Sequence, residues 1–247
     1  MSRRRRNTRL RELLLGATLV MLGSRGSAAP NGLTQIPIAK VFGDGVGAFS
    51  LAYTQLDTTS TVYTAQYGLG NWLELGVDYQ AAPRRQQTPL GNFKVLLLHQ
   101  PHQIPDVAAG MQNLAFGQAA VPYLVATTAP WAPDARGRGA PGLTLGVIRP
   151  SGSGYQLLAG LSYNLSANLQ LVADGITGPE SYRTVGVIAS LSKEVTLNLA
   201  YAQPNDRARN PRGFIVNLAY TLHLKGHSPQ QGGPSEKNPT PGGAGPA

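Results

Sequence analysis

The sequence contains no cysteine and few charged residues. Without cysteine, a disulfide scaffold, a thiolate metal site and a cysteine nucleophile are all excluded. Charged residues make up 13% of the chain, whereas ordinary globular domains contain about 25%. Beyond residue 30 no apolar run reaches the roughly 18 residues that a transmembrane helix requires. Glycine (30) and proline (19) are abundant among the 247 residues, which favours many turns.

The net charge of +9 is concentrated at the N-terminus. Residues 1–29 contain seven arginines and one glutamate, and the remainder, with 14 basic and 11 acidic residues, is nearly neutral. This basic stretch is followed by an apolar segment, 13–23, and by small residues at 26–29. That order is typical of a secretory signal peptide, and a helix of 11 apolar residues reaches only about 16 Å. We therefore predict that residues 1–29 are a removed signal peptide, and that the charge indicates no nucleic-acid partner.

The chain after residue 30 alternates between apolar and polar residues with a period of two, which predicts β-strands. In residues 73–79 (LELGVDY) and 195–201 (VTLNLAY), one face is apolar and the other small or polar. Gly, Pro, Asn, Asp and Ser separate segments of about ten residues. The predicted strands are 46–55, 60–68, 71–80, 92–100, 106–116, 119–128, 141–149, 154–164, 167–176, 181–191, 194–203 and 212–224.

The short links between these strands indicate an antiparallel meander, because parallel pairs need a long crossover. The residues opposite the apolar faces are mostly Ser, Thr, Asn, Gln, Gly and Ala, not the charged residues of a solvated surface. Strands of about ten residues also match a bilayer crossing. We predict an all-β, antiparallel up-and-down transmembrane β-barrel of about 12 strands (10–14). A soluble sandwich or lipocalin-like barrel is the alternative.

The barrel domain is predicted to span residues 30–225 and a disordered Pro/Gly-rich tail residues 226–247. Residues 33–42 are either a periplasmic lead-in or an extra strand. Twelve tilted strands enclose a lumen no wider than about 10 Å. If the N-terminus is periplasmic, the long loops 81–91 and 203–212 face outward. The loop 129–141 does not fit, so either the strand count slips by one or one periplasmic loop is long.

Several short motifs resemble YjbH-type bacterial outer-membrane β-barrel proteins. They are Asn31–Ala39 (NGLTQIPIA) with Gly43–Gly45, Val107–Phe116 (VAAGMQNLAF), Val121–Thr127 (VPYLVAT) and Leu161–Leu199. The similarity covers most of residues 31–224. It implies an outer-membrane location and a link to exopolysaccharide production or export. The chain differs from that family because larger members are much longer and because a Pro/Gly tail follows its last predicted strand.

Polar residues on the predicted inward face are the first candidate site residues. An inward carboxylate needs water or a partner, and Lys94 and Arg183 are candidate partners. We interpret the carboxylates as structurally paired in preference to an ion-selecting ring. The lumen-facing polar set is Glu74, Asp78, Asn168, Gln170, Asp174, Thr196, Asn198, Asn217 and Thr221.

Basic loop residues and histidines form the second set. The histidines His99, His102 and His223 occur without a Gly-x-Ser-x-Gly elbow or a His-Glu-x-x-His helix, so we expect no catalytic residues and no metal site. Loop arginines are able to meet acidic polysaccharide or lipid phosphate, although solvated loops also explain them. They are Arg84, Arg85, Arg136, Arg138, Arg207, Arg209 and Arg212.

Together these patterns predict a monomeric outer-membrane barrel that acts as a narrow conduit or accessory scaffold linked to exopolysaccharide. The expected partners are outer-membrane lipids, the barrel-assembly machinery and polysaccharide, with no cofactor and no nucleic acid. Two alternatives stay open: a barrel enzyme acting on lipid or glycan, and a secreted soluble β-barrel binding protein.

Overall fold

The structure is a computed structural model that describes residues 32–56, 59–81, 89–99, 105–115, 120–128, 134, 136–150, 152, 154–208 and 210–224. The predicted signal peptide (1–29) and tail (226–247) lie outside these residues. Within them, no helix is long and apolar enough to cross a membrane. The strands are β1 (Val46–Gln55), β2 (Thr59–Leu69), β3 (Leu73–Ala81), β4 (Leu90–Leu98), β5 (Asp106–Leu114), β6 (Val121–Thr128), β7 (Gly139–Ile148), β8 (Gln156–Ser166), β9 (Leu169–Ile176), β10 (Tyr182–Ser190), β11 (Val195–Pro204) and β12 (Gly213–His223).

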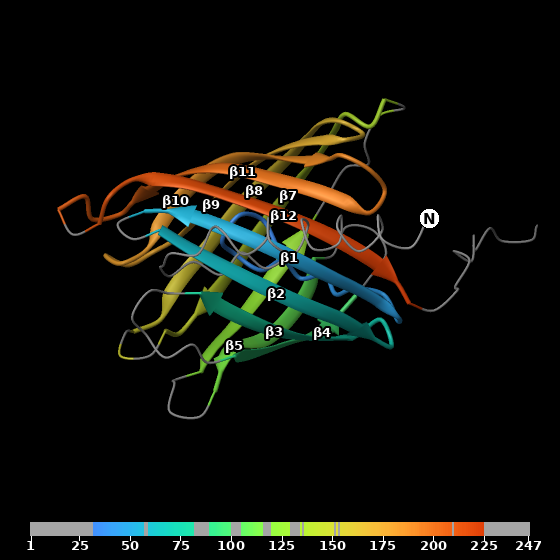
Figure 1. The fold of residues 1–247 in the computed structure, drawn as a ribbon, viewed down its shortest axis with the longest axis horizontal. Helices are drawn as coiled ribbons and strands as arrows, with labels where there is room; N and C mark the ends of the chain where they lie inside the picture. Colours follow the sequence, from blue (N-terminus) through green and yellow to red (C-terminus); the bar gives the residue numbers. More distant parts are fainter. Residues whose placement is uncertain are drawn as a thin grey trace, which may run out of the picture.

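The twelve strands form one closed barrel in which each strand pairs antiparallel with its sequence neighbours. β1 closes the barrel against β12 in an unbroken register from Val46↔His223 to Gln55↔Phe214. These two strands lie side by side in Figure 1. Closure leaves no sheet edge with unpaired backbone groups, which is the requirement for a sheet in hydrocarbon.

The predicted fold class is confirmed, and every strand boundary lies within two residues of its predicted position. The connection between β6 and β7, which the loop pattern did not fit, follows six strands. The predicted number of strands before this connection is therefore correct, and the connection is a long one on the side where the N-terminal start of β1 and the end of β12 lie.

The side chains alternate in the sense expected of a membrane barrel. On β1, Phe49 and Leu51 are 55% and 41% exposed, whereas Ser50, Ala52 and Thr54 are buried. The same pattern continues on β8, where the outward residues Leu157 and Leu161 are largely exposed, and on the other strands. Apolar residues thus face outward and small or polar residues face the interior, which is the reverse of a soluble β-sandwich.

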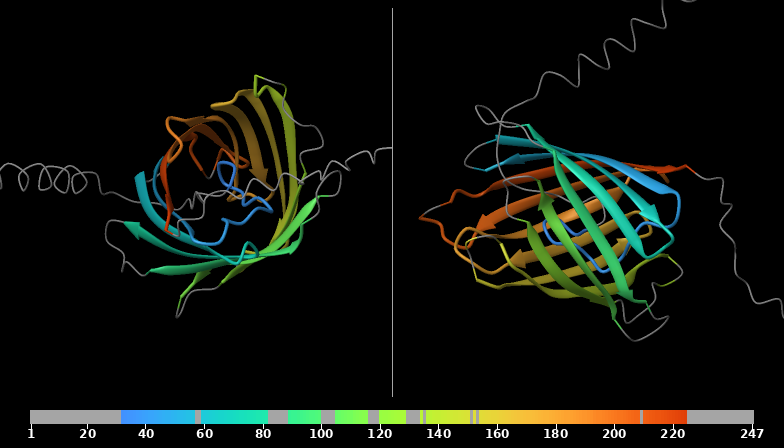
Figure 2. Two further views of the ribbon diagram at one scale, coloured as in Figure 1. Left: turned by 90° about the vertical axis from the view of Figure 1, so that its right-hand side faces the viewer. Right: turned by 90° about the horizontal axis from the view of Figure 1, so that it is seen from below.

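The segment 32–44 lies inside the barrel, which neither alternative for residues 33–42 anticipated. It is neither a lead-in below the barrel nor an extra strand, because its only bridge joins Gly32 to Pro37 within the segment itself. Figure 2 shows it, in blue, within the ring of strands when the barrel is viewed along its axis. We call residues 32–44 the lumenal segment.

The outward apolar face generates a depth-dependent prediction. Leu161, at the middle of β8, is 58% exposed, and Leu165, near the β8–β9 turn, is 42% exposed. In a membrane barrel, Leu161→Arg is expected to lower the free energy of unfolding by about 2–4 kcal/mol and Leu165→Arg by about 0–1 kcal/mol. Urea titration of the protein folded into phospholipid vesicles measures both values. Equal, small effects at the two positions would contradict a lipid-facing surface.

Candidate lumenal site

A buried ion pair joins β3 and β4 inside the barrel. The register places Glu74 opposite Lys94, and Lys94 Nζ lies 3.2 Å from Glu74 Oε1 with both side chains only 4% exposed. The other oxygen of the Glu74 carboxylate accepts the backbone N–H of Phe42 at 3.1 Å. The pair therefore neutralises two buried charges and also holds the end of the lumenal segment that precedes β1.

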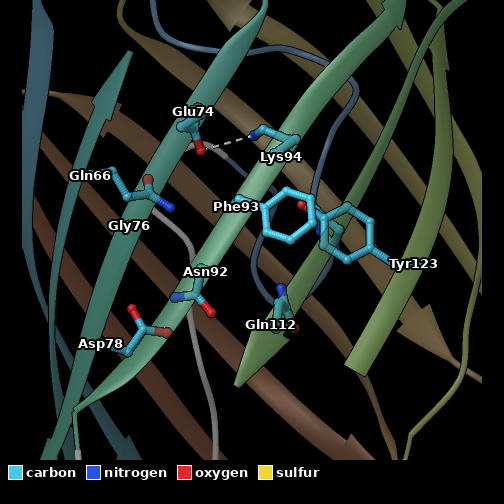
Figure 3. A pocket seen from close by; sticks show the side chains of 10 residues that line it. Gln66, Glu74, Gly76, Asp78, Asn92, Phe93, Lys94, Gln112 and Tyr123 are labelled. Carbon is cyan, nitrogen blue, oxygen red and sulfur yellow. Dashed lines mark ion pairs between the residues drawn. The ribbon is translucent and has the colours of Figure 1, made fainter. Parts of the chain in front are cut away.

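The polar cluster around this pair encloses a small cavity. Its wall includes Gln66, Asp78, Asn92, Gln112 and Tyr123 from β2 to β6, together with Pro37 of the lumenal segment. Figure 3 shows these strand side chains around the cavity, with the Glu74–Lys94 pair at one end of it. The cavity holds about 20 Å³, which is room for about one water molecule.

A glycine allows the Tyr123 ring to reach this cluster. Gly110 of β5 lies opposite Tyr123 of β6 in the register. A side chain at position 110 would overlap the Tyr123 ring and the backbone of Phe93. The absence of a Cβ at Gly110 therefore lets the ring lie across β5 toward the interior.

A second carboxylate, on β9, binds the other end of the lumenal segment. Asp174 Oδ2 accepts the backbone N–H groups of Thr34 and Gln35 at 2.6 and 2.9 Å. Its other oxygen accepts the hydroxyl of Thr184 on β10. Asn198 of β11 donates its side-chain N–H to the carbonyl of Leu33 at 3.4 Å. Charge-assisted hydrogen bonds of this kind are stronger than neutral ones, so Asp174 anchors the loop 32–37 against β9–β11.

Apolar packing completes the attachment. Leu33, Ile36 and Ala39 are buried together with inward side chains of β5–β9, which include Ala108, Tyr123, Val125, Ile148, Leu158 and Val172. A Cβ at Gly160 on β8 would lie 2.7 Å from the Ile36 Cδ1 atom and would also overlap Leu33. Ala39 donates its backbone N–H to Thr127 Oγ1 at 2.9 Å. The absence of a side chain at position 160 thus leaves the space that the lumenal segment occupies.

The wall formed by β1, β2 and β12 is polar in contrast. The hydroxyls of Ser50, Thr54, Ser60 and Thr64, and Oδ1 of Asn217, are buried without a hydrogen-bond partner among the described residues. Buried polar groups in native proteins are normally satisfied by protein or by ordered water. The interior is therefore divided into an apolar side that packs on the lumenal segment and a polar side suited to hydration.

The structure places most of the expected lumenal residues on the inner face. Glu74, Asp78, Asp174, Asn198 and Asn217 are buried. Gln170, Thr196 and Thr221 are half-buried on the inward-facing positions of β9, β11 and β12, and Gln170 donates to Asn164 at 3.0 Å.

Two expectations about inward residues are wrong. Asn168 is exposed in the turn between β8 and β9, because β9 begins one residue later at Leu169. Arg183 is exposed on the outer face of β10 and donates from Nε to Asn205 Oδ1 at 3.1 Å. Arg183 therefore pairs with none of the lumenal carboxylates, whereas Lys94 pairs with Glu74.

The histidines and loop arginines form no cluster with the lumenal residues. His99 Nδ1 lies 2.8 Å from Asp106 Oδ1 at the barrel rim, with the His99 side chain 68% exposed. His223 is exposed at the end of β12. His102 lies outside the described residues, and the described part of the chain contains no group of three His, Asp or Glu side chains that could hold a metal ion.

Four of the seven predicted loop arginines are described. Arg136 and Arg138 are exposed, and their backbone N–H groups both donate to Asp134 Oδ1 at 2.8 Å. Arg207 and Arg212 are exposed in the connection between β11 and β12. The other three, Arg84, Arg85 and Arg209, lie outside the described residues.

Comparisons with known proteins identify the fold. No family model matches the sequence, and no curated protein matches it. Among solved structures, the chain is similar to a KdgM porin, with a TM-score of 0.51 and 10% sequence identity over 71% of this chain and 99% of that one. A KdgM porin in complex with disordered oligogalacturonate gives a TM-score of 0.52, with the same identity and coverage. The chain thus has the barrel fold of a KdgM-type porin.

The buried ion pair generates a stability prediction. Lys94→Met leaves Glu74 buried without its cationic partner, so the free energy of unfolding is expected to fall by about 3–5 kcal/mol. The double variant Lys94→Met/Glu74→Gln removes both charges and is expected to lose less than Lys94→Met alone. Urea titration in vesicles of both single variants and the double variant gives the coupling free energy. Strictly additive losses would show that the two charges do not interact.

Proposed function

We propose that this protein is an exported outer-membrane β-barrel that forms a narrow conduit, with its own residues 32–44 obstructing the lumen in the resting state. The observation that carries the proposal is the combination of an apolar outer face, a polar inner face and a segment bonded across the interior to β3, β6, β9 and β11. The KdgM-type porin fold supports a channel of this kind.

The charge of the inner wall bears on which solutes pass. The buried charged side chains on the described strands are Glu74, Asp78, Asp174 and the single cation Lys94. An excess of carboxylates attracts cations and repels anions near the pore. One KdgM structure holds oligogalacturonate, a polymer of acidic sugars. This lumen is poorly suited to such a polyanion, so we propose that it passes small uncharged or cationic hydrophilic solutes.

A link to exopolysaccharide remains part of the proposal through the resemblance to YjbH-type barrels. The wall charge favours an uncharged glycan over an acidic one, either as a passing oligosaccharide or as a polymer for which the barrel is an accessory scaffold. We propose no enzymatic role, because His99 and Asp106 lie at the rim, with the His99 ring mostly in solvent. We also propose that the barrel-assembly machinery inserts the protein as a monomer, with β12 as the last strand.

Among the interactions that hold the lumenal segment, those of Asp174 are the ones that a single substitution weakens most. Asp174 alone accepts two backbone N–H groups of the lumenal segment. A hydrogen bond to a charged group contributes about 1.5–3 kcal/mol, so losing one shifts a closed–open equilibrium roughly tenfold or more. Release of the loop 32–37 would leave the attachments at Ala39 and Phe42 and would widen the lumen.

Planar-bilayer conductance tests this proposal. We expect weak conductance from the wild-type barrel, and a roughly tenfold or larger rise in the time spent open for Asp174→Asn. Gly160→Val is expected to act in the same direction without changing charge, because its side chain takes the space of Leu33 and Ile36. Asp106→Asn is the matched control, since Asp106 binds His99 at the rim. Under a salt gradient, the open state should favour cations.

Heat-modifiable migration on a cold, unboiled gel shows whether each variant forms a closed barrel. If folded Asp174→Asn and Gly160→Val both conduct no better than wild type, the lumenal segment does not control the conduit. If the open state strongly prefers anions, the proposed solute class is wrong.

A further inference from the structure

The outer surface of the barrel carries a groove whose floor adjoins Gly160, Asp174 and Thr184, which hold the lumenal segment on the inner face. It runs along β8 and β9 toward the β9–β10 connection and has a volume of about 860 Å³. Outward leucines of β7 and β8 (Leu143, Leu157 and Leu161) form one wall. The connections 177–179 and 205–206, together with Arg183, close the other side and one end.

The sequence makes this groove by a change in side-chain size. The outward positions of β8 and β9 along its floor are Ala159, Ala173 and Gly175. Elsewhere on the same two strands, outward positions are leucine or tyrosine, as at Leu161, Tyr163 and Leu171. Short side chains between bulky ones leave a concave strip in a wall that is otherwise convex. The lining is predominantly apolar.

The guanidinium of Arg183 lies at the end of the groove and is held by a hydrogen bond. Asn205 accepts the Nε–H of Arg183 and donates from Nδ2 to the carbonyls of Ile176 and Gly178 at 2.7 and 2.8 Å. Arg183 is therefore held by the same residue that fixes the β9–β10 connection. None of the hydrogen bonds described for Arg183 uses its terminal nitrogens, which leaves them available to an anion.

An acidic residue also lies at this end of the groove. Asp206 lines it, and its Oδ1 accepts the backbone N–H of Ala208 at 3.0 Å, which orients the carboxylate without neutralising its charge. Glu180 is exposed in the β9–β10 connection and does not line the groove. The groove thus joins an apolar trough on the strands to the guanidinium of Arg183, at the barrel end opposite the N-terminal start of β1.

We propose that this groove binds a phosphorylated glycolipid of the outer leaflet. One acyl chain of the lipid lies in the apolar trough, and its phosphate binds Arg183. The inference rests on the proposed outer-membrane location. Apolar surface at the depth of hydrocarbon is filled by an acyl chain, and arginine binds phosphate through a bidentate fork. Arg183 lies at the end away from the termini, and that end faces outward in barrels of this type. Phosphate attached to acyl chains in the outer leaflet is the anion that both features fit.

Lipid retention by the purified full-length barrel tests the site. Native mass spectrometry of the protein in detergent, with added lipid A in competition with phosphatidylethanolamine, should show one retained lipid A. Ala173→Leu fills the floor and Arg183→Gln removes the cation, and each is expected to lower lipid A retention roughly tenfold. Arg212→Gln, an exposed loop arginine that does not line the groove, is the matched control and should retain lipid A as the wild type does.

Equal retention of lipid A by all four proteins, or equal retention of both lipids by the wild type, would overturn the proposed site. A weakening in Arg212→Gln as large as in Arg183→Gln would indicate a diffuse charge effect and would also overturn it. Heat-modifiable migration on a cold gel shows that each variant is folded. Membrane fractionation separates this outcome from failure of the proposed function, because a barrel in the outer membrane that retains no glycolipid refutes the groove alone.

Discussion

Every backbone N–H and C=O group in hydrocarbon must find its partner within the protein, because lipid offers none. This constraint explains why β1 and β12, at opposite ends of the barrel sequence, pair over ten residues without a break. Once the sheet is closed, the period of two assigns one face to lipid and the other to the lumen. The distribution of leucine, serine and carboxylate over the chain follows from that assignment.

The interior of the barrel is subject to a different constraint, because a closed barrel with a polar lining has no apolar core of its own. The lumenal segment supplies one on the side of β5–β9, where Ile36 and Leu158 are almost fully buried. Three of its backbone N–H groups, those of Thr34, Gln35 and Phe42, donate to the wall carboxylates Asp174 and Glu74. These carboxylates therefore have a structural task, because they hold the segment that obstructs the lumen of the proposed conduit.

The strands and the direction of their faces could be predicted because they are encoded locally. Residues 73–79 and 195–201 alternate over distances shorter than one strand, and Gly, Asn and Ser mark the turns. The Glu74–Lys94 pair could also be anticipated, since both residues are inward and lie on adjacent strands. Asn168 was misassigned because β9 begins one residue after it, at Leu169. Arg183 was proposed as an inward partner although it shares the outward side of β10 with Val185.

The position of the lumenal segment could not be predicted in this way. Residues 33–42 show no sustained alternation, and their partners lie far away in sequence, with Thr34 and Asp174 separated by 140 residues. The apolar residues Leu33 and Ile36 beside Pro37 were a signal of burial, but not of where they are buried. The role of Gly160 could not be predicted either, because nothing in its strand distinguishes it from other glycines until Leu33 and Ile36 are placed beside it. The external groove depends in the same way on small residues that meet across two strands, as Ala159 of β8 does with Gly175 of β9.

The central claim is that the apolar face of each strand contacts lipid. Because the chain has no cysteine, single cysteines can be introduced along β8 from Leu157 to Asn164 and labelled with an environment-sensitive fluorophore in vesicles. The account predicts a period of two, in which odd-numbered positions are quenched by lipid-attached quenchers and even-numbered positions are not. Quenching of the even-numbered positions, or lipid quenching at neither set, would contradict it.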